Sequence, residues 1–284
     1  MTALSVVIPA HNEEAVIARA LRGLLDSAAD DIDVIVAANG CSDETVSRAL
    51  AVDPRVRVVE TGTASKIAAL NLGSDAVVRY PVAFVDADVR VSGEDLATLA
   101  ARLEADATLF VAAPAMQVTP SRSWWVRQYY RVWALTDYRA SGHIGSGVYM
   151  LTAAARSRFD RFPDVIADDL FIQRLFAPEE RLTPRDLDFC VDAPATVRAL
   201  IGRNTRIAAG NRQLAESFPD LAPPPGSTGA RALVGRVWRR PGLWVGFAVY
   251  AGVYLTAHRR ARRLLARRAE IAWTRDDTTR VGAA

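Results

Sequence analysis

The N-terminal third of the chain alternates between segments that favour β-strands and segments that favour helices. Apolar runs typical of buried strands lie at 4–10, 33–40, 55–60 and 82–89, and patterns typical of helices lie between them at 12–28, 41–51 and 65–77. Strands that alternate with helices of this length form βαβ units, in which successive strands pair in parallel. The sequence therefore predicts an α/β fold with a largely parallel sheet. Asn12 is the predicted N-cap of the first helix, because Asn is a favoured cap and two acids follow it.

Two aspartates lie at the end of the fourth predicted strand. Asp86 and Asp88 are separated by one alanine, and side chains of an extended chain alternate between faces, so both carboxylates are expected on one side. Like charges this close raise each other's pKa unless a cation lies between them. At the carboxyl edge of a parallel sheet, where ligands gather, the pair favours Mn²⁺ or Mg²⁺ shared with phosphate groups. The alternative is that the two acids only cap a loop.

Seven short motifs follow one another along residues 4–212. They are VVIPAHNEE, NGCSDET, SKIAALNLG, VDADV, GSG, ADDL and RNTRIAAGN. Each motif is weak alone, whereas seven in order are specific. With them the chain resembles the family 2 glycosyltransferases, whose GT-A fold is a largely parallel, Rossmann-like mixed sheet flanked by helices. The resemblance implies an inverting enzyme that takes a sugar from a nucleoside diphosphate sugar, with Mn²⁺ or Mg²⁺ held by Asp86 and Asp88.

The resemblance also assigns residues to the nucleotide sugar. Those expected to bind it are Pro9, Ala10, Glu13, Asn39, Lys66, Asp86, Arg203 and Arg206. The family's second motif usually carries an acid that reads the base, but Ala38 and Asn39 stand there in this chain, so the base is left open. Asn39 and Gly40 also fit an ordinary tight turn. Lys66 is the only lysine among 35 basic residues, which favours a position that needs a compact ammonium; a solvated surface lysine is the alternative.

Two arginines in the last motif suit a diphosphate. Arg203 and Arg206 would share one face of a helix, and guanidinium groups bind phosphate well. Processive polysaccharide synthases of the family carry Gln-x-x-Arg-Trp at this point, whereas this chain has Arg203 at the Gln position and Ile207 at the Trp position. This difference argues for the transfer of one or a few sugars.

The motif ADDL carries the implied catalytic acids. The resemblance places the general base at Asp169, with Asp168 where the family often has Glu. A base there would take the proton of an acceptor hydroxyl, lipid-linked or small, while the diphosphate departs on the opposite face. Acids that begin a helix are also stabilised by its dipole, and both roles can hold together. Gly145, Ser146 and Gly147 are expected to form an acceptor-side loop, or an ordinary turn.

The C-terminal part has a composition of its own. Residues 222–269 contain no acid, while 231–268 contain ten arginines, which suggests an anionic membrane surface as a partner. The uncharged run 243–257 would reach about 22 Å as a helix, short of a hydrocarbon core of ~30 Å. We therefore expect an in-plane anchor rather than a span, the alternative being a helical hairpin packed on the catalytic domain.

These features define the expected organisation of the protein. A catalytic domain is expected over 1–218, followed by a linker and C-terminal helices over 219–284. Two cysteines and no signal-peptide pattern predict a cytoplasmic protein. The arginine-rich segment would place it at the cytoplasmic face of the membrane, and the resemblance implies cell-envelope glycan synthesis with no nucleic-acid partner. VVIPAHNEE lacks the Gly-rich loop of a sugar nucleotidyltransferase and the G-x-G-x-x-G of an NAD enzyme. The nucleotidyltransferase and a catalytically silent nucleotide-sugar-binding module remain as alternatives.

Overall fold

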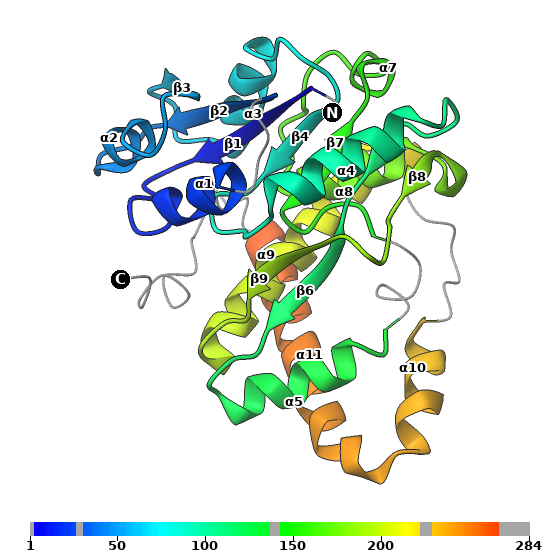
Figure 1. The fold of residues 1–284 in the computed structure, drawn as a ribbon. Helices are drawn as coiled ribbons and strands as arrows, with labels where there is room; N and C mark the ends of the chain where they lie inside the picture. The colour runs from blue at the N-terminus through cyan, green and yellow to red at the C-terminus, as the bar shows by residue number, and fades with distance from the viewer. Residues whose placement is uncertain (1–2, 27–30, 137–142, 222–228, 267–284) are drawn as a thin grey trace.

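The computed structural model describes residues 3–26, 31–136, 143–221 and 229–266 (Figure 1). Its strands are β1 (Leu4–Ala10), β2 (Ile32–Asn39), β3 (Val56–Thr61), β4 (Val82–Val85), β5 (Val111–Ala112), β6 (Ala115–Thr119), β7 (Val148–Leu151), β8 (Arg181–Leu182) and β9 (Asp188–Asp192). Its α-helices are α1 (Ile17–Leu25), α2 (Thr45–Leu50), α3 (Lys66–Asp75), α4 (Gly93–Glu104), α5 (Trp124–Trp133), α7 (Ala153–Arg156), α8 (Asp168–Leu175), α9 (Val197–Ser217), α10 (Gly229–Trp238) and α11 (Trp244–Ala266). Three short 3₁₀ helices are η1 (Pro178–Glu180), η2 (Pro219–Leu221) and η3 (Pro241–Leu243).

The main sheet combines a parallel half with a mixed half. Its seven strands lie in the order β3-β2-β1-β4-β7-β5-β8, and β6 pairs with β9 in a second sheet. The first four strands of this order are parallel, as the βαβ pattern predicts. β7 then runs antiparallel to both β4 and β5. The predicted α/β class with a largely parallel mixed sheet is confirmed.

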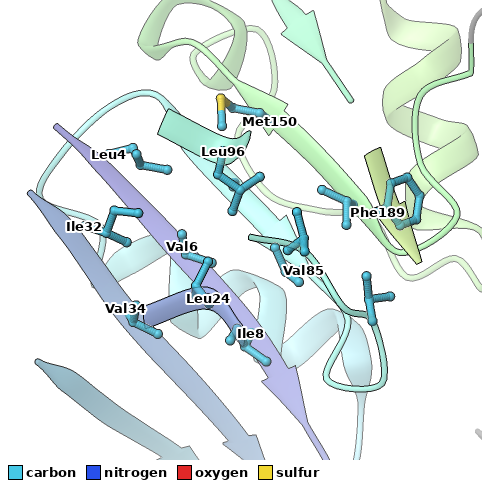
Figure 2. Close-up of a cluster of buried hydrophobic side chains, with 14 of the residues drawn as sticks. Leu4, Val6, Ile8, Leu24, Ile32, Val34, Val85, Leu96, Met150 and Phe189 are labelled. Atoms are coloured by element: carbon cyan, nitrogen blue, oxygen red, sulfur yellow. The ribbon is translucent and has the colours of Figure 1, made fainter. Parts of the chain in front are cut away.

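The core lies on both faces of this sheet because β1 is buried on both sides. Val6 and Ile8 face one layer, where they belong to the same cluster as Leu96 of α4 (Figure 2). Val7 faces the other layer, together with Leu70 of α3. Burying a side chain such as Leu96 contributes about 2 kcal/mol. The near-continuous apolar run of β1 is therefore what a strand covered by helices on both faces requires.

Helix α3 packs unusually closely on the sheet. A Cβ added to Gly73 would lie 2.4 Å from Cγ1 of Val7, so only glycine allows this approach. At the other end of the helix, the Ser65 side chain accepts a hydrogen bond from the Ala68 amide (3.3 Å), and the helix begins at Lys66. The close packing and the cap together place Lys66 at the carboxyl edge of the sheet.

The predicted N-cap of the first helix is wrong. α1 begins at Ile17, and Asn12 lies five residues earlier with a left-handed φ of 51°. Its side chain bonds across to the next loop instead, where Oδ1 accepts the Ser42 amide (2.7 Å). Asn tolerates this backbone region better than most residues. The polar residues after β1 thus shape a loop, and the helix begins only at the apolar stretch.

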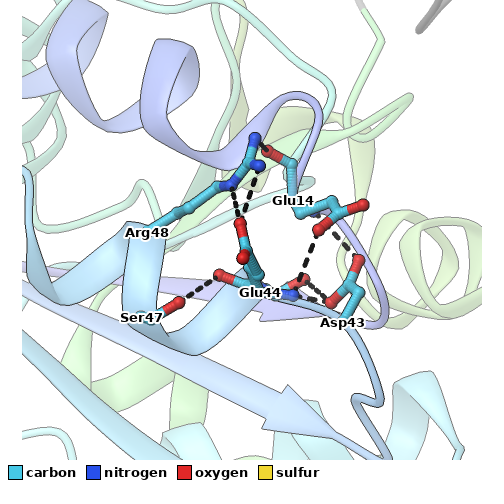
Figure 3. Close-up of polar contacts among 6 residues, drawn as sticks. Glu14, Asp43, Glu44, Ser47 and Arg48 are labelled. Carbon is cyan, nitrogen blue, oxygen red and sulfur yellow. Dashed lines mark hydrogen bonds and ion pairs between the residues drawn. The ribbon is translucent and has the colours of Figure 1, made fainter.

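Further polar contacts join the loop after β1 to the start of α2 (Figure 3). The Glu14 amide donates to Asp43 Oδ2 (3.3 Å), and the Glu44 amide donates to Glu14 Oε2 (3.2 Å). Arg48 reaches the Glu14 carbonyl (3.1 Å) and also pairs with Glu44. These contacts fix the two strand-to-helix loops relative to each other.

The C-terminal helix α11 packs along α9 and α5. Its inner face consists of small residues and one valine: Gly246, Val253, Ala257 and Ala261 are buried. A Cβ at Gly246 would lie 2.8 Å from the Gln128 carbonyl oxygen, so the helices touch closely there. Within the described ranges, no helix is both long and apolar enough to cross a membrane. Part of the predicted linker (222–228) and the segment from residue 267 onward lie outside those ranges.

Candidate active site

The candidate site lies where β4 ends. Val85, Ala87 and Val89 are buried, while Asp86 and Asp88 between them are partly exposed. The strand predicted over 82–89 is too long, because β4 ends at Val85. Residues 86–89 form a turn rather than the extended segment that the sequence predicted, with the Val89 amide donating to the Asp86 carbonyl (3.1 Å). The segment is held in place by the Asp86 amide, which donates to the Gly147 carbonyl (2.8 Å).

Lys66 joins acids that come from two different elements. Its Nζ lies 2.8 Å from Oδ1 of Asp86 and 3.0 Å from Oδ1 of Asp168, the first residue of α8. The Asp168 side chain is 4% exposed, whereas that of Asp86 is 36% exposed. The lysine therefore lies between a buried acid and an acid open to the solvent side. The sequence indicated that Lys66 lies either near the nucleotide or on the solvated surface, and it gave no sign of the bond to Asp168.

Burial and crowding of charge set the electrostatics of these acids. Burial raises the pKa of Asp168 to about 6; Lys66 opposes this shift, and the neighbouring Asp169 and Asp86 add to it. Burial also raises the pKa of Asp86, against the effect of Lys66 and with the help of Asp88. For Lys66, burial alone would lower the pKa, but Asp168 and Asp86 outweigh it and raise the pKa above its usual value. The ammonium is thus firmly charged and partly neutralises the acids.

A second partner of Asp168 is Tyr149, which the sequence did not indicate. Tyr149 lies on β7 and donates its hydroxyl to Asp168 Oδ2 (3.2 Å). Its ring stacks on Phe84 of β4, with ring centroids 5.1 Å apart. Burial, followed by the charge of Asp168, raises the pKa of Tyr149 well above its usual value, so the hydroxyl remains a donor. Asp168 is consequently held from two sides.

Asp169 has a different environment from its neighbour. It is partly exposed, and its Oδ2 accepts the Ser146 amide (2.9 Å) while its Oδ1 accepts the Leu170 amide (2.7 Å). The two adjacent acids therefore divide into a buried one tied to Lys66 and a more accessible one bonded to backbone amides.

The glycine-rich loop 145–147 contacts two of the acids, Asp169 of α8 and Asp86 at the end of β4. Gly145, Ser146 and Gly147 all have positive φ, at 113°, 61° and 110°. A Cβ on Gly145 would lie 2.5 Å from the Cβ of Asp169, so no larger residue fits without a shift. The predicted acceptor-side residues thus contact Asp169 through Ser146 and Asp86 through Gly147.

Helix α9 contributes positive charge. Burial lowers the pKa of Arg206, as does Arg203 nearby, while Asp86, Asp88 and Asp169 oppose this shift. Arg206 is therefore near enough to Asp86, Asp88 and Asp169 for their charges to act on its guanidinium. Arg203 lies close to Arg206 on α9, as their predicted spacing implies.

The residues assigned to the base and ribose lie at neighbouring strand ends. Pro9 and Ala10 end β1, and the Glu13 amide that follows donates to Thr45 Oγ1 (2.6 Å). Asn39 ends β2 fully buried, with Nδ2 donating to the Ala10 carbonyl (2.9 Å). Its Oδ1 is buried without a hydrogen-bond partner among the described residues. As placed, the Asn39 side chain bonds to β1.

A divalent cation fits this site only in part. In the portions of the chain that the structure describes, no three His, Cys, Asp or Glu side chains converge to hold a metal. Asp86 and Asp88 offer hard oxygen ligands, but Lys66 already binds Oδ1 of Asp86. A small divalent cation with few protein ligands completes its shell from water and phosphate oxygens. Asp86 and Asp88 therefore fit Mn²⁺ or Mg²⁺ only when a bound diphosphate and water supply the remaining ligands.

A mixed sheet with acids gathered at its carboxyl edge is the arrangement expected of a GT-A fold. The family model described as Glycosyl transferase family 2 matches residues 5–160, more than half of the chain. The chain belongs to this family, and it is a glycosyltransferase. The comparison with curated proteins finds no match.

Solved structures share the fold. A mannosyltransferase from Pyrobaculum calidifontis, PcManGT, in complex with GDP-Man and Mn²⁺, is 21% identical with a TM-score of 0.60, over 96% of this chain and 81% of that one. Glucosyl-3-phosphoglycerate synthase from Mycobacterium tuberculosis, in complex with Mn²⁺, UDP and glucosyl-3-phosphoglycerate, is 20% identical with a TM-score of 0.50, over 67% of this chain and 71% of that one. At such identities the likeness concerns the GT-A fold.

Proposed function

We propose that the protein transfers a sugar from a nucleoside diphosphate sugar to a hydroxyl acceptor, with inversion at the sugar carbon. The observation that carries this proposal is the difference in burial and bonding between two adjacent acids at the start of α8. Asp168 is buried and bonded to Lys66 and Tyr149, while Asp169 is accessible and bonded to backbone amides. A transferase of this type needs one carboxylate that stays ionised and open to an acceptor.

In this proposal Asp169 is the general base. It takes the proton of the acceptor hydroxyl as the oxygen attacks the sugar carbon from the face opposite the diphosphate. The amide of Ser146 orients the carboxylate (2.9 Å), and the positive φ of Gly145 keeps this loop close to it. Asp168 positions Lys66 and the start of α8.

The donor would lie between β4 and α9. Arg206, with Arg203 near it, feels the charges of Asp86 and Asp88 at the end of β4 and would bind the diphosphate. Asp86 and Asp88 would hold Mn²⁺ or Mg²⁺, which supplies charge stabilisation to the leaving phosphate when bound. Complexes of two proteins with the same fold contain Mn²⁺ with GDP-Man or UDP, which supports a nucleotide-sugar donor. Pro9, Ala10, Glu13 and Asn39 would lie nearest the base and ribose.

The proposal also covers the acceptor and the location of the protein in the cell. A lipid-linked or small hydroxyl compound would enter beside the loop 145–147, with the catalytic domain over 1–218 and the C-terminal helices over 219–284. The arginine-rich segment 231–268 would contact an anionic membrane at its cytoplasmic face, in the synthesis of a cell-envelope glycan. The uneven charge of the sequence supports this membrane partner.

A thermal-shift screen with a turnover assay tests the function. UDP, GDP and dTDP are each added with and without Mn²⁺, and the preferred nucleotide at a hundredfold excess over its Kd should raise Tm by about 5 °C. The matching nucleotide sugar should then be hydrolysed slowly in the presence of Mn²⁺. Stabilisation without any hydrolysis or transfer would indicate a silent binding module, and no stabilisation by any nucleotide would refute the proposed donor.

A further inference from the structure

The turn between α10 and α11 exposes two tryptophans side by side. Trp238 ends α10 with 72% of its surface exposed, and Trp244 begins α11 with 51% exposed. Their ring centroids are 5.9 Å apart, and Val245 next to them is also exposed. We call residues 238–245 the hairpin tip. It lies at the end of the molecule formed by α10 and α11 (Figure 1).

The exposed pair does not result from a loosely packed turn. Val237 and Leu243, the direct neighbours of the two tryptophans, are buried in a cluster with Val132 of α5. Arg236 also joins α10 to the segment after α5, because its guanidinium donates to the Leu135 carbonyl (2.6 Å). The tip therefore has its own apolar contacts to the body of the protein, and the tryptophans point away from them.

Positive charge surrounds the exposed rings. Arg239 and Arg240 lie between the two tryptophans and are exposed. No acid occurs from residue 222 to residue 269, so no carboxylate of this segment balances them. Tryptophan is favoured at the boundary between lipid headgroups and acyl chains, and arginine beside it binds anionic headgroups. A polyanion without an apolar layer would bind the arginines but would give the exposed indole rings no apolar environment to enter.

The inner face of α11 is not available for the same task. Val253, Ala257 and Ala261 are buried, and α11 packs along α9 and α5. An in-plane anchor that used this inner face would have to leave this packing, whereas Tyr254 and Leu255 on the outer side of the same helix are exposed. The two tryptophans at the tip need no such rearrangement.

We propose that the hairpin tip docks on an anionic lipid bilayer, with Trp238 and Trp244 inserted at the headgroup level and Arg239 and Arg240 on the lipid phosphates. This proposal rests on the membrane partner of the proposed function and locates its contact. Tyr250 lies six residues beyond Trp244, about 9 Å along α11. There it stacks on Tyr129, whose hydroxyl donates to Asn204, the residue that follows Arg203 on α9 (2.9 Å). Docking through the tip would thus keep Arg203 and Arg206 of α9 near the bilayer surface.

Vesicle partition of the full chain tests the docking. Phosphatidylcholine vesicles, with or without an equal part of phosphatidylglycerol, are sedimented with wild-type protein and with the Trp238→Ser/Trp244→Ser variant. The matched control is Trp124→Ser/Trp125→Ser, another exposed pair (46% and 54%). It lies at the start of α5, where Trp124 is eight residues or about 12 Å along the helix from Val132. The tip variant should lose at least tenfold in partition to the anionic vesicles, and the control less than twofold.

Two further readouts make the result decisive. Arg239→Gln/Arg240→Gln should weaken partition about fivefold per arginine removed. Brominated lipids should quench wild-type tryptophan fluorescence, and this quenching should be lost in the tip variant. Equal loss in both tryptophan pairs, unchanged partition of the tip variant, or binding without quenching would overturn the proposal. Donor hydrolysis by each variant without vesicles should match wild type, so a failure of docking is distinguished from a failure of the transferase function.

Discussion

The ammonium of Lys66 lies 3.0 Å from Oδ1 of Asp168, an almost fully buried carboxylate on another helix. Lys66→Gln should therefore lower the free energy of unfolding by about 3 kcal/mol at pH 8, because it leaves a buried acid without its cation. Urea denaturation measures the change. The matched control is Arg79→Gln, which breaks an exposed pair with Asp31 and should cost less than about 0.5 kcal/mol. Equal losses in the two variants would contradict the role of Lys66.

The raised pKa of Asp168 predicts a pH dependence of stability. Between its unfolded pKa near 3.8 and its folded pKa of about 6, the native state binds the proton more tightly, so stability falls as the pH rises through this window. Asp53 and Asp186, whose pKa values arginine partners lower, act in the opposite direction. The difference between wild type and Asp168→Asn isolates the effect. Relative to the variant, wild type should lose about 2 kcal/mol from pH 4 to pH 7; a difference that does not change with pH would refute the assigned pKa.

Asp88 is expected to act on the metal. Asp88→Asn should abolish the additional Tm increase that Mn²⁺ gives to the bound nucleotide, since an amide is a poorer ligand for a hard cation than a carboxylate. The nucleotide alone should still stabilise the variant. Differential scanning fluorimetry with the preferred nucleotide, with and without Mn²⁺, measures both effects. A full Mn²⁺ response in the variant would exclude Asp88 as a ligand.

Asp169 is expected to act only on the chemical step. Asp169→Asn should reduce kcat by a factor of about 10² to 10⁴, the usual contribution of a general base. Nucleotide and Mn²⁺ should stabilise the variant as they stabilise wild type, because Asp169 bonds to backbone amides rather than to Lys66. Transfer kinetics and thermal shifts are measured on the same preparation. Near-normal turnover would show that another group takes the proton.

Gly145 is predicted to be essential for the position of Asp169. Gly145→Ala combines a φ of 113° with a Cβ only 2.5 Å from that of Asp169, so it should cost about 2 kcal/mol and lower kcat. Gly252→Ala in α11 is the control, because nothing lies within 4 Å of its Cβ; it should raise stability by up to about 1 kcal/mol. If both variants had wild-type kcat and stability, the loop would not constrain the acid.

Much of the parallel half of the sheet could be predicted from local pattern. The strand expected at 4–10 coincides with β1, and β2 and β3 differ from their predicted ranges by one residue at each end. These strands are buried runs with clear stops, which pattern alone reveals. The start of α1 could not be predicted in this way, because Asn12 bonds to a loop thirty residues later.

Only part of the candidate site could be predicted in the same way. The motifs indicated Asp86, Lys66 and Asp168 separately, but not the bonds that join them. Those bonds depend on how closely α3 packs on β1 and on where α8 begins, which are tertiary matters. Tyr149 was missed because β7 pairs antiparallel with β4, more than sixty residues earlier, and a strand of four apolar residues carries no sign of its partner.

The short loop at 145–147 bonds to the candidate metal ligand through Gly147 and to the candidate base through Ser146. Attempts to redirect the enzyme to new acceptors by randomising this loop would therefore disturb donor handling and proton abstraction at the same time. Engineering of acceptor choice should begin at side chains that touch neither acid, so that a change in selectivity can be separated from a damaged catalyst.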